Sequence, residues 1–272
     1  METKVILEKQ DLTYLKWSHV RNSSGTAGTF LKSQSTLEGR KIYYKLSNFE
    51  KENGIVGHEN INEIIVDRLL TVLGVDHLHY QLIYADIEVD GRTYTAYVCA
   101  SEDFKERGES KAALDAMYQA DKKEDENEYE YCKRLGFEEY IDTMLAVDYI
   151  ILNRDRHGAN IEVLRNARKH TLRIAPLFDH GVSLLFSCRS DDEILKFDIQ
   201  KDIGCNNFIG SKSTAQNLKL LSSKNVFKNE LNKSHKDFIF EGLDNVISEI
   251  HRDKVWEMIM KRYQNYENIR NN

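Results

Sequence analysis

The spacing of apolar and polar residues divides the chain into a strand-rich first part and a helix-rich second part. Two β-prone runs, at 80–89 and 92–100, flank Asp90-Gly91, a dipeptide that suits a type I′ turn between the strands of a hairpin. Two shorter runs, at 28–33 and 40–48, lie around another polar turn. The pattern therefore predicts a small sheet within about the first hundred residues.

One helix is predicted between these strands. Isoleucine, leucine and valine residues recur at helical spacing over residues 60–73. Asn60 is suited to cap the start of this helix, Glu63 lies at the capping-box position, and Gly74 can end the helix. The expected order is strands, one helix, and strands again.

Helices dominate the pattern after residue 100. Residues 137–152 form a long, mostly apolar run that leads directly to Asn153. Residues 160–166 and 171–179 read as a hairpin whose turn lies at 166–170, and residues 180–230 are irregular and polar. Two amphipathic segments, at 236–250 and 253–269, predict helices that close the chain.

Composition narrows the classes of protein to which the chain can belong. Its 272 residues suit one large domain or two small lobes. The formal net charge of −6 argues against a general nucleic-acid binder, and no run is long and apolar enough for a membrane span or a signal peptide. The four cysteines are widely scattered, which is typical of reduced thiols in a cytoplasmic protein.

The candidate chemistry lies in the stretch NRDRHGAN and in the LFDHG that follows the predicted hairpin. Asp155 and Asn160 lie five residues apart in one loop, and Asp179 lies at the far end of the hairpin. Because a hairpin returns the chain to its start, Asp179 can approach Asn160. Side-chain oxygens of this kind bind Mg²⁺, and a neighbouring carboxylate can act on a hydroxyl, which is the arrangement of phosphoryl transfer.

DRHGAN followed by FDHG resembles the catalytic loop and metal-binding motif of phosphatidylinositol kinases and of HipA-like serine/threonine kinases. The wording GTAGTFLKS, GRKIYYKLSN and NEIIVDRLLTVLG is similar to the short HipA-like kinases of the cell-translocating kinase (CtkA) type. The likeness covers nearly the whole chain. It implies an α+β, two-lobed protein-kinase-like fold, with an N-lobe at about 1–100 and a C-lobe at about 101–272.

The resemblance also implies a role for each motif residue. Asp155 would be the catalytic base, with His157 near the γ-phosphate of ATP, and Asn160 and Asp179 would hold Mg²⁺. Lys45 would pair with the α- and β-phosphates and would be steadied by Glu63. Backbone N–H groups would cover the phosphates, and the last strand of the N-lobe would hold the adenine. The residues implied for these two backbone roles are Ser24, Gly25, Thr26, Ala27 and Gly28 for the phosphates, and Val98, Cys99 and Ala100 for the adenine.

The resemblance favours ATP- and Mg²⁺-dependent transfer to Ser or Thr of an unknown protein substrate, with autophosphorylation at Ser23 or Ser24. Two alternatives remain on the same fold. One is a kinase of a small molecule or lipid, and the other is a non-catalytic binding module. Glu59 is a lower-ranked partner for Lys45. Full-length HipA proteins carry a further N-terminal subdomain and work beside an antitoxin, and since that subdomain has no match here, an antitoxin partner is doubtful.

A different chemistry for the same stretch is a phosphohydrolase-type metal site. His157 and His180 would then join Asp155 and Asp179 as metal ligands. This interpretation leaves Lys45 and Glu63 without a role and ranks below a kinase.

Overall fold

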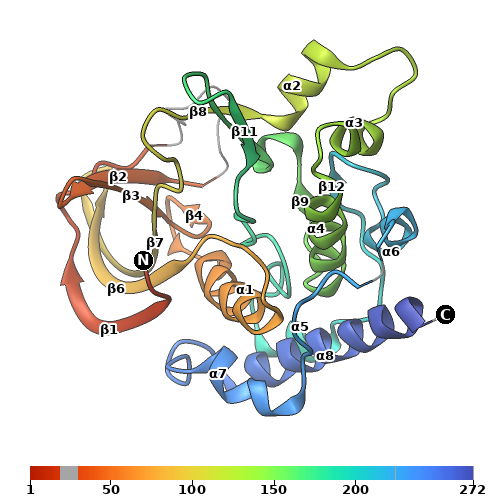
Figure 1. Cartoon of the computed structure of the whole chain (residues 1–272). Coiled ribbons are helices and arrows are strands. Elements are labelled where there is room, and N and C mark those ends of the chain that lie inside the picture. The colour runs from red at the N-terminus through yellow and green to blue at the C-terminus, as the bar shows by residue number, and fades with distance from the viewer. Residues whose placement is uncertain (19–29, 224, 272) are drawn as a thin grey trace.

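The computed structural model describes residues 1–18, 30–223 and 225–271. A five-stranded sheet forms the first part of the chain, in the order β1-β6-β7-β3-β2 (Figure 1). All neighbouring strands are antiparallel except β1, which runs parallel to β6. The strands are β1 (Lys4–Asp11), β2 (Lys32–Leu37), β3 (Arg40–Lys45), β6 (Tyr80–Val89) and β7 (Arg92–Glu102).

The predicted hairpin is confirmed as β6 and β7. The strands pair from Tyr80↔Ser101 to Val89↔Arg92, and both turn residues have positive φ, 51° at Asp90 and 75° at Gly91. Positive φ at both central residues is what a type I′ turn requires. The turn thereby fixes the register of the two longest strands of the sheet.

The predicted helix is α1 (Glu59–Leu73), which lies between the sheet and the later helices (Figure 1). Gly74 ends it in the left-handed region, as predicted. The predicted capping is wrong: the N-cap is His58, and Asn60 and Glu63 lie inside the helix. Both side chains have tertiary partners instead, because Asn60 Nδ2 donates to the backbone oxygens of Lys45 and Tyr97, and Glu63 pairs with Lys45.

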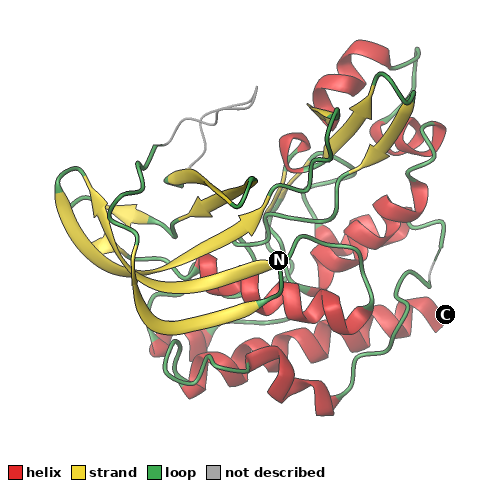
Figure 2. Cartoon of the chain, turned by 60° about the vertical axis from the view of Figure 1, so that its left-hand side comes forward, coloured by secondary structure: helices red, strands yellow, loops and turns green. Residues whose placement is uncertain are grey.

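Helices build the second part of the molecule, and Figure 2 shows them gathered beside the sheet. The predicted helix before Asn153 is confirmed as α4, whereas the two predicted C-terminal helices have other lengths, since α7 is one short turn and α8 is long. The helices are α2 (Leu114–Asp121), α3 (Glu128–Arg134), α4 (Glu138–Ile150), α5 (Asp191–Lys196), α6 (Thr214–Asn217), α7 (Lys236–Phe240) and α8 (Glu249–Asn271).

Small strands and 3₁₀ turns complete both parts, with β4 and β5 between β3 and α1 and the others after β7. The hairpin before Asp179 is confirmed as β10 and β11, and β8 pairs with β10 on its other edge. The elements are β4 (Phe49–Glu50), β5 (Gly54–Ile55), β8 (Ser110–Ala113), β9 (Asp155–Arg156), β10 (Glu162–Asn166), β11 (Thr171–Ile174) and β12 (Asn206–Asn207), with 3₁₀ turns at Gly158–Asn160, Leu218–Leu220 and Lys233–His235.

Two apolar cores lie on either side of the sheet. One fills the outer face, around Leu46, Ile87 and Val98. The larger one joins α1, including Ile64 and Leu69, to α4 and α8. Helix α1 thus packs into the core of the helical part as well as against the sheet, which fixes its position relative to both.

Within the described part of the chain, no helix is both long and apolar enough to cross a bilayer.

Candidate active site

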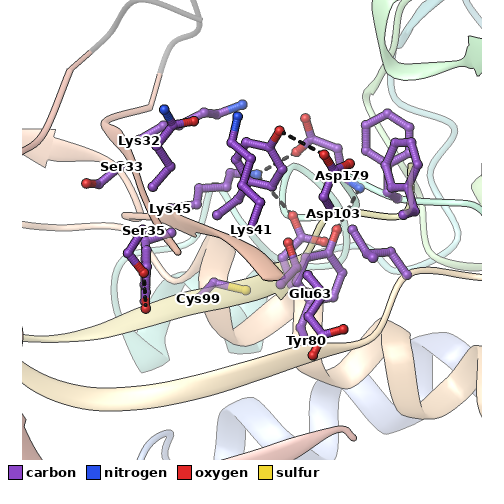
Figure 3. A pocket seen from close by; sticks show the side chains of 18 of the residues that line it. Lys32, Ser33, Ser35, Lys41, Lys45, Glu63, Tyr80, Cys99, Asp103 and Asp179 are labelled. Atoms are coloured by element: carbon purple, nitrogen blue, oxygen red, sulfur yellow. Dashed lines mark hydrogen bonds and ion pairs between the residues drawn. The ribbon is translucent and has the colours of Figure 1, made fainter. Parts of the chain in front are cut away.

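Lys45, Glu63 and Asp179 meet at the junction of the two parts, although they come from β3, α1 and the segment after β11 (Figure 3). Lys45 Nζ lies 3.0 Å from Glu63 Oε1 and 2.5 Å from Asp179 Oδ1. Glu59, the lower-ranked partner, instead accepts the Asn48 N–H at 3.1 Å. The sequence prediction that Lys45 pairs with Glu63 therefore corresponds to a contact in the structure, and Asp179 joins it.

The charges of this group determine one another. Burial acts to lower the pKa of Lys45, but the carboxylates of Asp179 and Glu63 outweigh it, so the pKa lies above its usual value. Burial raises the pKa of Glu63, against the opposing charge of Lys45. Lys45 is therefore a permanent ammonium ion whose side chain is only 13% exposed. A buried cation of this kind needs anionic partners, and phosphate oxygens can supply them.

The backbone around Asp179 is held in an uncommon conformation. Asp179 has φ of 59°, and its N–H donates to the Tyr80 hydroxyl at 3.1 Å. The next N–H, that of His180, donates to Glu63 Oε2 at 2.8 Å. A Cβ at Gly181 would lie 3.0–3.1 Å from Glu59 atoms, so a side chain there would crowd α1. The close approach of α1 thus explains the glycine in the FDHG motif.

Asp155, His157 and Asn160 form a second group, on β9 and the 3₁₀ turn that follows. Asn160 Nδ2 donates to the Asp155 backbone oxygen at 2.9 Å, and Asn206 Nδ2 donates to Asp155 Oδ1 at 3.1 Å. His157 Nε2 lies 3.8 Å from Asp155 Oδ2. The Asp155 side chain remains 37% exposed, so an incoming hydroxyl can reach it.

Arg156 joins the second group to the segment that carries Asp179. Its buried guanidinium pairs with Asp148 of α4, with Nη2 to Oδ1 at 2.9 Å, and Nη1 donates to the Phe178 backbone oxygen at 2.8 Å. Nη1 also donates to the Asn160 backbone oxygen at 3.4 Å. One side chain therefore holds the backbone of Asn160 and that of Phe178, the residue before Asp179.

A cleft of about 870 Å³ opens above Lys45 and Asp179. The rings of Phe104 and Phe178 lie at its side with centroids 5.4 Å apart, and Lys111 Nζ lies 4.0 Å from the Phe104 centroid. Both lysines and carboxylates line the cleft. Figure 3 labels ten of the lining residues, which are Lys32, Ser33, Ser35, Lys41, Lys45, Glu63, Tyr80, Cys99, Asp103 and Asp179.

The cleft contains only part of the predicted set. Lys45, Glu63, Cys99 and Asp179 line it, but Asp155, His157 and Asn160 do not. Val98 and Ala100 point to the opposite face, into the outer core of the sheet. The predicted phosphate loop, Ser24 to Gly28, and the predicted phosphorylation site at Ser23 or Ser24 lie outside the described residues.

Sequence reasoning missed the residues that position the site, which are Tyr80, Arg156, Asp148, Asn206 and Phe178. Their partners are 8 to 99 positions away along the chain. The one local signal was the arginine inside the DRHGAN motif, because an arginine between a buried helix and a turn needs a partner. The remaining contacts become visible only in three dimensions.

The structure offers no ligand set for the phosphohydrolase alternative. His180 is buried, and this burial holds its pKa well below the usual value, with Nδ1 4.0 Å from Glu63 Oε2. His157 is beside Asp155 instead. Among the described residues, the ligand atoms of His157, His180, Asp155 and Asp179 do not gather into one group.

Comparison with known proteins gives similarity in fold. No protein-family model matches the sequence, and no curated protein matches it significantly. The structure is similar to the proinflammatory kinase CtkA of Helicobacter pylori, with a TM-score of 0.61, 15% identity, and coverage of 95% of this chain and 98% of that chain.

The structure is also similar to a chain of the HipA–HipB toxin–antitoxin complex with operator DNA from Shewanella oneidensis MR-1. The TM-score is 0.50 and the identity 13%, over 90% of this chain and 64% of that chain. These matches confirm the predicted fold class and the structural resemblance to HipA-like kinases. The chain has the two-lobed kinase fold that CtkA and HipA share.

Proposed function

We propose that the chain is a kinase that transfers the γ-phosphoryl group of ATP to a Ser or Thr hydroxyl of a protein. The observation that carries this proposal is the contact of Lys45 with both Glu63 and Asp179, beside a loop that presents Asp155 and Asn160. Phosphoryl transfer needs a cation on the phosphates, oxygen ligands for a metal, and a carboxylate near the hydroxyl. This chain has each of these in one region.

The nucleotide would occupy the cleft above Lys45. Its phosphates would take the Lys45 ammonium as their cation, and Lys41 and Lys32 line the same cleft. The backbone of Cys99 is paired with β6 on one side and β3 on the other. Hydrogen bonds to adenine therefore fit better where the chain leaves the sheet after Glu102, beside the Phe104 ring.

Asn160 and Asp179 would hold the magnesium ion. The amide oxygen of Asn160 and the carboxylate of Asp179 are the hard oxygen donors that Mg²⁺ prefers. Arg156 donates to the backbone oxygens of Asn160 and of Phe178, the residue before Asp179, which supports a fixed placement of the two backbones. A bound divalent ion would neutralise charge on the phosphates, as it does in other phosphoryl-transfer enzymes.

Asp155 would act on the acceptor hydroxyl. The hydroxyl oxygen forms a bond to the γ-phosphorus, the bond from that phosphorus to the β-phosphate oxygen breaks, and the hydroxyl proton passes to the Asp155 carboxylate. Asn206 donates to Oδ1 of this carboxylate and leaves Oδ2 facing His157. The exposure of Asp155 at the rim of the site favours a hydroxyl on a protein over a small molecule enclosed in the cleft.

Incubation with γ-labelled ATP and Mg²⁺ tests the proposal. We expect phosphate on serine or threonine of the wild type, found by intact mass and phosphopeptide mapping, and none on Asp155→Asn or Asp179→Ala. Asp192→Asn is the matched control, because Asp192 is an exposed acid in the first turn of α5, and it should behave as wild type. The same map shows whether Ser23 or Ser24 is modified.

The other functions predict different results. A chain that binds ATP but modifies no protein would favour the small-molecule or lipid kinase. ATP binding that is unaffected by Asp179→Ala, with no transfer, would favour a non-catalytic module. Equal phosphate incorporation in the wild type and in the Asp155→Asn, Asp179→Ala and Asp192→Asn variants would contradict the proposed roles of Asp155 and Asp179.

A further inference from the structure

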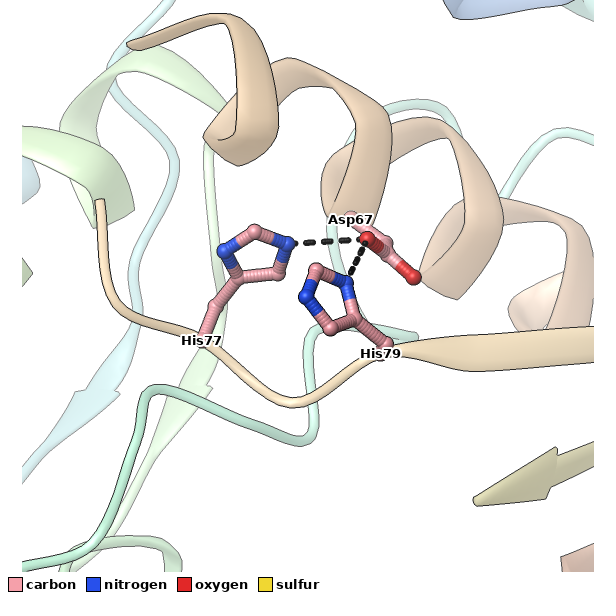
Figure 4. A group of neighbouring side chains, drawn as sticks. All are labelled: Asp67, His77 and His79. Carbon is pink, nitrogen blue, oxygen red and sulfur yellow. Dashed lines mark hydrogen bonds and ion pairs between the residues drawn. The ribbon is translucent and has the colours of Figure 1, made fainter. Parts of the chain in front are cut away.

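A second cluster of polar side chains lies away from the cleft, between α1 and the loop that leads into β6. Asp67 of α1 faces His77 and His79 of this loop, as Figure 4 shows. His77 Nε2 is 2.8 Å and His79 Nδ1 is 3.0 Å from Asp67 Oδ1. Among the described residues, Asp67, His77 and His79 form a group of three His, Cys, Asp or Glu side chains whose ligand atoms lie close enough to share one ion.

The hydrogen bonds of His77 indicate what should lie between these atoms. His77 Nδ1 is 2.7 Å from the Val75 backbone oxygen, which can only accept, so Nδ1 carries a proton. In a neutral ring, Nε2 then has a lone pair, and it faces the Asp67 carboxylate. Two acceptors at this distance repel unless a proton or a metal ion joins them. Histidine ligands of metals have this pattern, with the other ring N–H donated to a backbone carbonyl.

The carboxylate is also oriented as a ligand. Asp67 Oδ2 accepts the Tyr80 N–H at 2.7 Å and the Thr3 hydroxyl at 2.8 Å. The Tyr80 N–H thus holds Oδ2, while the Thr3 hydroxyl also lies 2.9 Å from Oδ1, the oxygen that faces the histidines. His79 is 45% exposed, which gives an ion a path from solvent and leaves room for water as a further ligand.

We propose that Asp67 Oδ1, His77 Nε2 and His79 Nδ1 bind a divalent transition-metal ion, most suitably Zn²⁺. Two imidazoles and one carboxylate form a donor set that suits zinc and its neighbours in the first transition row, whereas Mg²⁺ prefers oxygen ligands alone. The hydroxyl oxygen of Thr3 lies 3.3 Å from His79 Nδ1, and the hydroxyl oxygen of Thr71 lies 3.4 Å from His77 Nε2. The site is independent of the proposed kinase chemistry.

The metal would stabilise the segment that carries Asp179. Tyr80, whose N–H donates to Asp67, accepts the Asp179 N–H through its hydroxyl. The loop between His77 and His79 also contacts the segment before Asp179, because Leu78 N–H donates to the Leu177 oxygen at 2.8 Å. An ion on Asp67 thus joins α1, the start of β6 and the Asp179 segment into one unit.

Metal uptake by the full chain tests this proposal. The protein is stripped with a chelator, dialysed into excess Mg²⁺ so that Mg²⁺ fills any oxygen-rich site, and titrated with Zn²⁺ or with Co²⁺ as a coloured probe. We expect one equivalent of Zn²⁺, a Co²⁺ visible band much stronger than that of the aqueous ion, and a higher thermal midpoint with Zn²⁺. His79→Ala, at an exposed position, should lose stoichiometric uptake while keeping the wild-type circular dichroism.

Matched variants separate this site from others. Thr3→Val removes a hydroxyl that contacts Asp67 and His79 without being a ligand, and it should weaken uptake by roughly ten- to a hundredfold. His170→Asn, which replaces an exposed histidine elsewhere, and Asp179→Ala should both keep full uptake. No stoichiometric uptake by the wild type, or equal uptake by His79→Ala, would overturn the proposal. The contact of His77 with Asp67 would then be a purely structural hydrogen bond.

Discussion

At the scale of single residues, the site depends on one cation shared by two carboxylates. Lys45 is the charge that lets Glu63 and Asp179 lie close together in a largely buried position. Removing one member of a buried ion pair costs more than the pair contributes, because the remaining charges lose their partner. We call Lys45, Glu63 and Asp179 the triad. A single substitution in the triad should therefore lower the stability of the protein more than a paired substitution that removes both opposite charges.

The first prediction is a non-additive loss of stability at this triad. Lys45→Met leaves two buried carboxylates facing each other, so we expect the free energy of unfolding to fall by about 3–5 kcal/mol. The double variant Lys45→Met/Glu63→Gln should be more stable than the sum of the single losses implies, as measured by urea unfolding. Lys41→Met, on the same strand and lining the same cleft, should change the free energy by less than about 1 kcal/mol. Additive losses would show that the charges do not interact.

The second prediction concerns Asn206, which donates to Asp155 from β12. Without this donor the carboxylate loses one of the contacts that orient it, while the cleft is unchanged. We expect Asn206→Ala to lower kcat about tenfold with little change in the KM for ATP. Asn207→Ala, at the next position of the same short strand, is a control for disruption of β12. A rise in KM alone would mean that Asn206 acts in nucleotide binding.

At the scale of elements, α1 connects almost every part of the molecule. Its polar residues contact different segments. Asn60 contacts the end of β3 and the middle of β7, Asn62 contacts the oxygens of Gly181 and Ser183, and Arg68 contacts the oxygens of Ile239 and Glu241. Its apolar residues belong to the core of the helical part. The position of Glu63 thus follows from a helix that is held at many points.

The same helix shows how far the sequence could predict the fold and the site. Apolar periodicity located α1, α4 and the two hairpins, because these signals are local. Asn60 and Glu63 were misassigned to a cap, since a capping pattern and a set of tertiary partners look alike in a single sequence. The strand β1 was missed because it pairs with β6, more than seventy positions away, and parallel pairing has no turn signal.

The motif residues could also be picked out from the sequence because their signals are local. DRHGAN and FDHG are each short, so their spacing could be recognised, and Lys45 and Glu63 could be placed by their order along the chain. The partners that orient them, Arg156 to Phe178 and Tyr80 to Asp179, join segments that only folding brings together. Our proposal for the adenine lies after Glu102 and not within β7, where the sequence prediction has it, because the sequence does not show where a strand stops pairing.

The third prediction follows from the contact between the start of α1 and α8. The rings of His58 and His251 lie 4.7 Å apart, and Asp191 is the nearby acid. Burial, with a smaller effect from His58, lowers the pKa of His251 to about 4, below its usual value of 6.5. Burial likewise lowers the pKa of His58. Both rings are therefore neutral in the folded protein at pH 7.

The unfolded chain binds protons on these histidines more readily than the folded chain does. Their contribution to stability is thus complete above pH 6.5 and declines as the pH falls from about 6.5 to 4. We expect His251→Phe to reduce the loss of unfolding free energy between pH 7 and 4.5 by about 2 kcal/mol, measured by urea unfolding. His170→Asn, at the exposed β10–β11 turn, should keep the wild-type pH profile. An unchanged profile in His251→Phe would show that the pKa of His251 is the same in the folded and the unfolded protein.

At the scale of the whole molecule, the cleft lies where two cores meet. β3 and β7 supply one wall, and the segment around Phe178 and Asp179 supplies the other. A ligand in the cleft touches both walls and therefore stabilises their relative position. A substitution of Asp155 should therefore affect phosphoryl transfer without affecting nucleotide binding, because Asp155 lies outside the residues that line the cleft.

The fourth prediction uses this separation. A non-hydrolysable ATP analogue with Mg²⁺, at about a hundredfold excess over its Kd, should raise the unfolding free energy of the wild type by about 2.7 kcal/mol, seen as a higher thermal midpoint. Asp179→Ala should lose most of this gain because it lacks the proposed metal ligand and leaves Lys45 with Glu63 alone. Asp155→Asn should keep the gain and yet transfer no phosphate, since the proposed base does not line the cleft. Mg²⁺ without the analogue is the control. If Asp155→Asn also loses the gain, Asp155 belongs to the nucleotide site, and the acceptor hydroxyl must be activated by another group.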